Sequence, residues 1–323
     1  MLGLGHSLVG GSLLDDSAYS MTKSFSFDGT DDVFLTNTVS GADPANGTIK
    51  PVSTSFSGAV WVRLDDGTTN PYALSDGAHH SIMGVKNNGG WGMTWYNRSF
   101  HMSVNYNNAD DMLLKSSFSK AMVRNDGNDY NRYLYKSDHW HLVIFTIDMS
   151  DPSSEVIGNL YVDGNRAQAG VAAEDGSSGE PQYGSQPEDS TSKLTSSASG
   201  GDITLRYDSN SDNDEVDFTI GAQCGFTAAT NVTSFNATGW TGRIGDVAVW
   251  EGVVLTQDDI ANLYNLHVPI DMSTIQSSNL RGYWRPTKGL SDSVSGETGT
   301  LVDDSAIIAD TPSLDVSGYA GYR

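Results

Sequence analysis

Residues 140–148, WHLVIFTID, constrain the fold of this chain more than any other segment. The run is apolar at nearly every position from Trp140 to Ile147, which is typical of a strand covered on both faces. It is followed by VIGNLYVDG at 156–164, where Asp163 and Gly164 can supply the positive φ angles of a two-residue hairpin turn. The pattern predicts a central strand and a hairpin inside packed β structure.

Shorter strand-like runs extend this pattern along the chain. They lie at 58–63, 81–86, 91–96, 100–106, 202–207, 216–221 and 241–252, separated mostly by Gly, Asn and Asp. Residues 23–35 alternate around Asp28 and Gly29 and predict a β-hairpin. Thr256, with Asp259 three positions later, can cap one short helix, which we expect at the sheet edge. A total of 35 glycines and only 18% charged residues suit many short strands joined by tight turns.

The composition divides the chain into three parts. A glycine-rich segment, 1–22, precedes a single β domain at 23–267, and an extension with a possible added strand covers 268–323. Within the domain, 170–201 is rich in Ser, Gly, Pro and acid and predicts a long exposed loop. We expect the two terminal segments to serve attachment.

The charge and the cysteine content exclude several classes of function. The chain has 18 basic and 40 acidic residues, a net charge of −22, so it repels nucleic acid. The single Cys224 excludes an internal disulfide. No run of about 18 apolar residues predicts a membrane helix. The start has no Lys or Arg before its apolar residues, which makes it a poor secretion signal and predicts synthesis in the cytoplasm.

Four segments, in their order, carry a family resemblance: SFSFDGTDDVFL, SGAVWVRLDDG, the stretch from HWHLVIFTID to YVDGNRAQAG, and DFTIGAQ followed by WTGRIGDVAVWEGVVLTQDDIANLYN. Together they resemble the laminin-G-like jelly-roll family of the concanavalin A-like lectin and glucanase superfamily. The resemblance implies an all-β, antiparallel jelly-roll β-sandwich with one short C-terminal helix and extended terminal segments. It implies carbohydrate binding more than catalysis.

The start, MLGLGHSLVGG, resembles leaders on laminin-G-like proteins encoded by tailed bacteriophages, particularly marine ones. This resemblance predicts a bacteriophage virion structural protein: a capsid decoration, a head fibre or another appendage. Such a protein is made in the host cytoplasm, contacts other virion proteins and its own copies, and turns a lectin-like domain toward host surface polysaccharide. The alternative is a free calcium-dependent lectin, and a polysaccharide-degrading enzyme is a third reading.

The catalytic motif of the superfamily is incomplete. Its glycoside hydrolases carry Glu-x-Asp-x-Glu or Glu-x-Asp-x-x-Glu, because a retaining mechanism needs two carboxyls about 5 to 5.5 Å apart. The nearest match here has Glu215 and Asp217 but not the second Glu. We therefore expect no enzyme.

Two groups are candidate binding residues. Asp208, Asn210, Asp212 and Asp214 alternate oxygen-bearing side chains as calcium prefers, although metal-free turns have the same composition. Tyr130, Arg132, Tyr133 and Tyr135 form a cluster between strands that fits glycan recognition or ordinary loop packing. Trp91 and Trp95, four apart on one strand face, are expected in the core. His139 and His141 could bind zinc, but packing is favoured.

Overall fold

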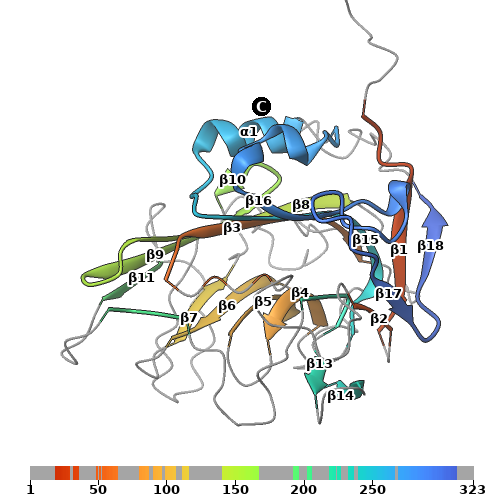
Figure 1. Ribbon diagram of the computed structural model, residues 1–323, viewed down its shortest axis with the longest axis horizontal. Helices are drawn as coiled ribbons and strands as arrows, with labels where there is room; N and C mark the ends of the chain where they lie inside the picture. Colours follow the sequence, from red (N-terminus) through yellow and green to blue (C-terminus); the bar gives the residue numbers. More distant parts are fainter. Residues whose placement is uncertain are drawn as a thin grey trace, which may run out of the picture.

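The computed structural model describes residues 19–29, 32–35, 49, 51, 53–64, 80–86, 90–96, 99–106, 111–115, 140–166, 192–195, 202–205, 218–222, 224–226, 232–235, 239–265 and 268–310. Two large sheets pack face to face, and the short α1 lies over the outer face of one of them (Figure 1). Every strand pair is antiparallel. The structure thus confirms the predicted antiparallel, jelly-roll-like β-sandwich.

The first sheet, here called sheet A, has nine strands. Its main order is β10-β9-β8-β3-β15-β1-β18, with β11 on β9 and β16 on β15. The bounds are β1 (Lys23–Asp28), β3 (Phe56–Leu64), β8 (Trp140–Asp151), β9 (Glu155–Val162), β10 (Asn165–Arg166), β11 (Ser192–Thr195), β15 (Thr241–Glu251), β16 (Leu280–Trp284) and β18 (Ala306–Ala309).

The second sheet, sheet B, has seven strands in the order β17-β2-β12-β4-β5-β6-β7. Its bounds are β2 (Val33–Leu35), β4 (His80–Lys86), β5 (Gly90–Tyr96), β6 (Ser99–Asn105), β7 (Asp111–Lys115), β12 (Thr219–Ile220) and β17 (Thr300–Val302). A separate pair joins β13 (Cys224–Phe226) to β14 (Val232–Phe235).

The apolar run at 140–148 lies inside sheet A, as predicted. β8 pairs with β3 on one side and with β9 on the other. Val143, Phe145 and Ile147 face the core between the sheets. Leu142 and Ile144 face a second core on the outer side of sheet A. Both faces of the strand are covered, which explains why it has few polar positions.

Residues 23–35 do not form the predicted hairpin. β1 belongs to sheet A, where it pairs with β15 and β18, whereas β2 belongs to sheet B, where it pairs with β12 and β17. The turn after Asp28 carries the chain from one sheet to the other. Phe25 and Phe34 stack across the sandwich with ring centroids 4.8 Å apart. Alternation predicted both strands correctly, but partners distant in sequence decide the pairing.

The segment after residue 267 contributes strands to both sheets. β16 pairs with β15, β17 with β2, and β18 with β1 (Figure 1). Within the stretch 170–201, Ser192–Thr195 form β11 beside β9, and the remainder lies outside the described residues.

On the outer face of sheet A, α1 (Gln257–Tyr264) and the short 3-10 helix η4 (Met272–Thr274) bury apolar side chains. The 3-10 helices η5 (Ser277–Asn279) and η6 (Pro286–Lys288) flank β16 in the sequence. Thr256 and Asp259 form the predicted capping box. Ile260 and Leu263 are buried against the sheet. The helix therefore packs on the face of sheet A rather than at its edge.

Candidate functional site

The outer face of sheet B carries two rows of cross-strand neighbours without large apolar side chains. One row crosses four strands as Ser103, Gly92, Gly84 and Thr219. The other crosses three strands as His101, Thr94 and Ser81. Alternate residues on the same strands, such as Met93 and Trp95, point into the core, so the rows point away from it. We call these seven residues the polar face of sheet B.

Two glycines form the floor of this face. A Cβ on Gly84 would lie 2.5 Å from the carbonyl oxygen of Trp91 and 2.6 Å from Cα of Gly92. Any side chain at Gly84 would therefore force β4 away from β5. The two backbones can lie this close only because the floor has no side chains.

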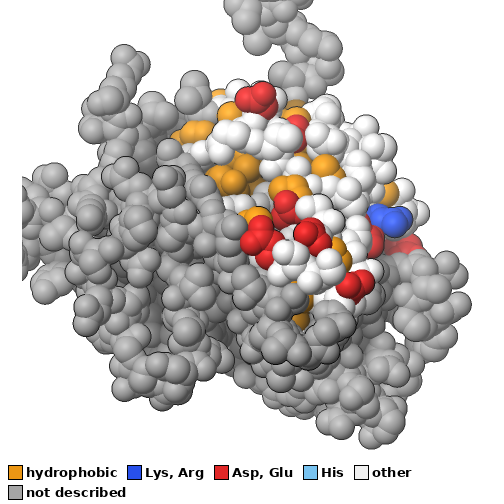
Figure 2. Space-filling view, turned by 90° about the vertical axis from the view of Figure 1, so that its left-hand side faces the viewer, with side chains coloured by type: hydrophobic (Ala, Val, Ile, Leu, Met, Phe, Trp, Pro, Cys, Tyr) orange, Lys and Arg blue, Asp and Glu red, His pale blue; other side chains and the backbone are white. Residues whose placement is uncertain are grey.

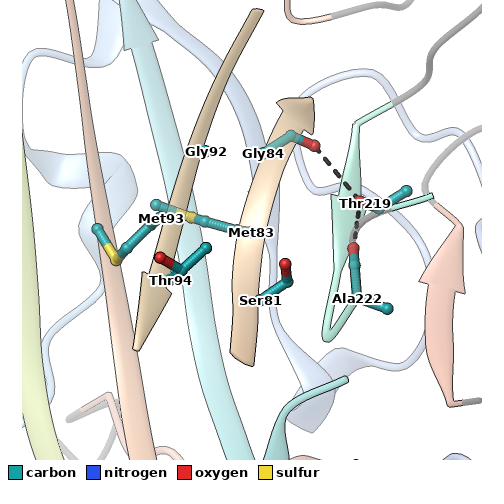
Figure 3. Close-up of a pocket in the computed structure, with 8 residues that line it drawn as sticks. All are labelled: Ser81, Met83, Gly84, Gly92, Met93, Thr94, Thr219 and Ala222. Carbon is teal, nitrogen blue, oxygen red and sulfur yellow. Dashed lines mark hydrogen bonds between the residues drawn. The ribbon is translucent and has the colours of Figure 1, made fainter. Parts of the chain in front are cut away.

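Hydroxyl groups lie at both ends of the glycine floor, on Ser103 and on Thr219. Figure 3 shows Thr219 beside Gly84. Thr219 Oγ1 donates to the carbonyl oxygen of Ala222 at 2.7 Å and lies 3.4 Å from that of Gly84. Ser103 Oγ lies 3.4 Å from the carbonyl oxygen of Gly92. A small hollow beside the floor, lined also by Ser81 and Thr94, has about 10 Å³ of space for the centre of a water molecule. That is roughly what one bound water needs.

The polar face is nearly closed to solvent. Ser81, Thr94, His101 and Thr219 are 4%, 7%, 3% and 3% exposed, and Ser103 is half-buried. The outer face of an antiparallel sheet is usually polar because water covers it. Here the groups are polar and buried together, which is costly unless they have hydrogen-bonding partners. The face therefore combines buried hydroxyl groups with glycine backbone, and the described residues supply no carboxylate pair there for catalysis.

The binding residues predicted from sequence lie outside the described residues. These are Tyr130, Arg132, Tyr133 and Tyr135 for glycan, and Asp208, Asn210, Asp212 and Asp214 for calcium. Glu215 and Asp217 are also outside them. Within the described part of the chain, no group of three or more His, Cys, Asp or Glu side chains could hold a metal ion. Trp91 and Trp95 lie in the core, as predicted, at 0% and 4% exposure.

His141, considered for zinc, instead contacts the hairpin turn after β9. Its Nδ1 lies 2.7 Å from Oδ2 of Asp163, and the backbone N–H of Leu142 donates to Oδ1 of the same carboxylate at 3.0 Å. Asp163 has a φ of 52° and Gly164 a φ of 74°, as the hairpin prediction required. The pair fixes the turn beneath Tyr264 of α1, whose ring would clash with a Cβ on Gly164. Sequence reasoning identified the turn but not its histidine partner.

Acidic side chains are spread over the part of the surface that the described residues form in Figure 2. Figure 2 shows Asp and Glu groups at several places on one face, with one basic group at the margin. This agrees with the net charge of −22 for the chain. Such a surface favours neutral over anionic ligands. Among the described residues, no helix has the length and hydropathy required to cross a bilayer.

Comparisons with known proteins give no family. No protein-family model matches the chain, and no curated protein matches it. Among solved structures, the receptor binding domain of botulinum neurotoxin D is 13% identical, with a TM-score of 0.38, over 79% of this chain and 46% of that chain. The serotype D ligand binding domain in complex with N-acetylneuraminic acid is 12% identical, with a TM-score of 0.39, over 77% and 43%.

The binding domain of Paraclostridial Mosquitocidal Protein 1 is 12% identical, with a TM-score of 0.35, over 78% of this chain and 48% of that chain. This chain thus spans less than half the length of each of these three domains. Likeness at this level carries no argument about function. The assignment of the fold rests on the strand order and pairing described above.

Proposed function

We propose that this chain is a non-catalytic, carbohydrate-binding β-sandwich and that the polar face of sheet B receives the sugar. The observation that carries the proposal is the glycine floor with hydroxyl groups at both ends, in a part of the sheet that faces away from the core. A sugar hydroxyl has the size and hydrogen-bonding capacity of the one water that the hollow accommodates. Because the side chains of the polar face are buried, binding requires the face to open, and one sugar hydroxyl would then occupy the hollow.

The surface charge narrows the class of sugar. With 40 acidic and 18 basic residues, the chain repels sulfated and phosphorylated glycans at long range. We therefore propose a neutral oligosaccharide as the ligand. Calcium bound by Asp208, Asn210, Asp212 and Asp214, and contacts from Tyr130, Arg132, Tyr133 and Tyr135, remain additional proposals from the sequence.

The test is a glycan array followed by titration calorimetry with the best neutral ligand. Thr94→Val and Ser103→Ala each remove one hydroxyl from the polar face. If that hydroxyl bonds the sugar, each variant should weaken binding about 2- to 10-fold, since one hydrogen bond is worth about 0.5 to 1.5 kcal/mol.

Thr146→Val is the matched control. Thr146 is also buried, at 1% exposure, but it lies in β8 of sheet A. It should change the affinity little, while a circular dichroism spectrum confirms that each variant is folded. If no neutral glycan binds, the proposed function is wrong. If a glycan binds and Thr94→Val and Ser103→Ala bind it unchanged, the site lies elsewhere on the molecule.

We also propose the finer assignment that the sequence resemblance favours, a bacteriophage virion structural protein with the sandwich facing outward. Its partners would be other virion proteins and further copies of this chain. The support is the Leu- and Gly-rich start and the four laminin-G-like segments. Mass spectrometry of purified virions from the source phage should find the chain in stoichiometric amount. Its consistent absence from intact particles would exclude this role and leave the free lectin.

A further inference from the structure

A buried carboxyl group lies on the opposite side of the molecule, on the outer face of sheet A. The pairing of β15 with β3 shifts between Ile244 and Val247, so Gly245 and Asp246 form a β-bulge. A bulge turns side chains away from the regular alternation of a strand. Asp246 is 0% exposed, and its carboxyl group contacts Tyr283 of β16.

The hydrogen bonding of this carboxyl group is incomplete. Tyr283 Oη donates to Asp246 Oδ2 at 2.9 Å, and the backbone N–H of Met272 donates to the same Tyr283 Oη at 3.1 Å. Asp246 Oδ1 is buried without a hydrogen-bond partner in the described part of the chain. A buried oxygen in this position is costly for a carboxylate, which needs several donors.

The guanidinium group of Arg285, whose charge acts on Asp246, is paired with a different carboxylate. Arg285 NH1 forms an ion pair with Asp271 Oδ2 at 3.0 Å, and the Nε of Arg285 is buried without a hydrogen-bond partner among the described residues. We call Asp246, Tyr283, Arg285 and Asp271 the Asp246 cluster. It contains one unpartnered acceptor and one unpartnered donor, so a rearrangement that joins them is chemically available.

The N-terminal segment covers the Asp246 cluster. The sulfur of Met21 accepts the backbone N–H of Asp246 at 3.4 Å and packs so tightly against Gly245 that a Cβ there would clash with it. The Tyr19 ring centroid lies 4.5 Å from Cζ of Arg285. Met21 is 1% exposed, so residues 19–22, the cover segment, exclude water from the carboxyl group.

Among the described residues, few hydrogen bonds hold the cover segment in place. The backbone N–H of Thr22 donates to Thr287 Oγ1 at 3.0 Å, and the backbone N–H of Asp310 donates to the carbonyl oxygen of Thr22 at 3.1 Å. A thioether is a weak acceptor, so the bond to Met21 adds little. The pairing with β15 and β18 begins only at Phe25 and Lys23. The cover can therefore lift without disrupting either sheet.

The surroundings of Asp246 favour its neutral form. Burial raises its pKa from 3.8 to about 7, while the Tyr283 hydrogen bond and the Arg285 charge lower the pKa and the Asp271 charge raises it. Burial, together with the Asp246 charge, also raises the pKa of Tyr283 well above its ordinary range, so that hydroxyl remains a donor. The ionised carboxylate, by contrast, requires water or a second donor at Oδ1.

We propose that residues 19–22 close over Asp246 when its carboxyl group is protonated and lift from sheet A when it is ionised. Lifting admits water to Oδ1 and allows Arg285 to turn its Nε toward the carboxylate. Lifting exposes the side chains of residues 19–22 to solvent. This switch is independent of the carbohydrate site proposed above.

Amide hydrogen exchange of the full chain, read by mass spectrometry at pH 5 and 7.5 and corrected for the intrinsic rate at each pH, tests the switch. The carboxyl group is exposed in the open form, which releases the proton, and buried in the closed form, which holds it. The equilibrium constant for opening of the cover segment therefore rises roughly tenfold per pH unit up to pH 7. The reporters are the amides of Thr22, Asp246 and Asp310, whose hydrogen bonds hold the cover segment in place. They should lose roughly fiftyfold in protection between pH 5 and 7. Those of β3 should not change.

Variants give the direction of the effect. Asp246→Asn keeps the shape without the titration and should remove the pH dependence of the cover segment. Tyr283→Phe removes an interaction that lowers the Asp246 pKa, so the loss of amide protection should level off at a higher pH than in the wild type. Asp271→Asn removes a charge that raises the Asp246 pKa, so the loss should level off at a lower pH. Equal protection of the Thr22, Asp246 and Asp310 amides at pH 5 and 7.5 in the wild type would overturn the proposal, as would a pH dependence that survives in Asp246→Asn.

Discussion

The global stability of the chain should carry the same proton linkage, measured against the Asp246→Asn variant. The folded pKa of Asp246 is raised from 3.8 to about 7, so the folded state holds a proton that the unfolded chain releases. The stabilisation by the neutral acid is fully present below about pH 4 and is lost as the pH rises to 7. The free energy of unfolding of the wild type should therefore fall relative to that of Asp246→Asn over this range.

The size of the effect follows from the shift. One pKa unit corresponds to 1.36 kcal/mol, so a shift of about 3 units is worth about 4 kcal/mol in total. The usable window begins near pH 5, because the net charge of the chain approaches zero as the pH falls toward its pI of about 4.3. From pH 5 to 7 the expected change is about 2 kcal/mol. This is an upper bound, since lifting of the cover segment relieves part of the cost.

Urea denaturation followed by tryptophan fluorescence measures the difference between the two proteins at pH 5, 6, 7 and 8. The comparison cancels the titration of all other carboxyl groups, which are the same in both chains. The difference should change steadily up to pH 7 and be constant above it. A difference that is flat from pH 5 to 8, or a wild type that gains stability relative to Asp246→Asn as pH rises, would refute the reasoning.

Three further predictions concern separate parts of the sandwich. Gly84→Ala should lower the free energy of unfolding by about 1 to 3 kcal/mol, because its Cβ forces β4 from β5; thermal denaturation measures this, and an unchanged midpoint would contradict the close approach. Thr256→Ala should cost about 1 kcal/mol through the lost cap of α1, whereas Thr256→Ser should cost much less. If residues 208–214 bind calcium, millimolar calcium should raise the melting temperature of the wild type and not of Asp212→Asn; equal shifts in both would exclude this site.

Local signals in the sequence predicted the local structure. The apolar run of β8, the positive φ angles at Asp163 and Gly164, and the capping box at Thr256 and Asp259 each depend on residues adjacent in the chain. Their physical causes, burial on two faces, turn geometry and satisfied backbone N–H groups, act over a few residues. These features could be predicted with their positions.

Features that depend on distant partners could not be predicted. Whether Phe25 and Phe34 lie in one hairpin or in two sheets is decided by the strands at 241–251 and 300–309. The burial of Asp246 could not be predicted either, because a single Asp in a strand of alternating residues normally indicates a position that faces solvent. The bulge beside Gly245 places it among apolar side chains instead. The glycine floor appears only when the register joins Gly84 to Gly92.

The two proposed functions can be tested separately because the sandwich places them on opposite sides. The polar face of sheet B and the Asp246 cluster of sheet A are separated by the whole inner core, which is closely packed and apolar. Neither site shares a hydrogen-bond partner with the other among the described contacts. Substitutions at such distant sites normally act additively. Thr94→Val should leave the pH dependence of residues 19–22 unchanged, and Asp246→Asn should leave the carbohydrate affinity at pH 6 unchanged. Coupling in a double-mutant cycle would show instead that lifting of the cover segment is transmitted through the core to sheet B.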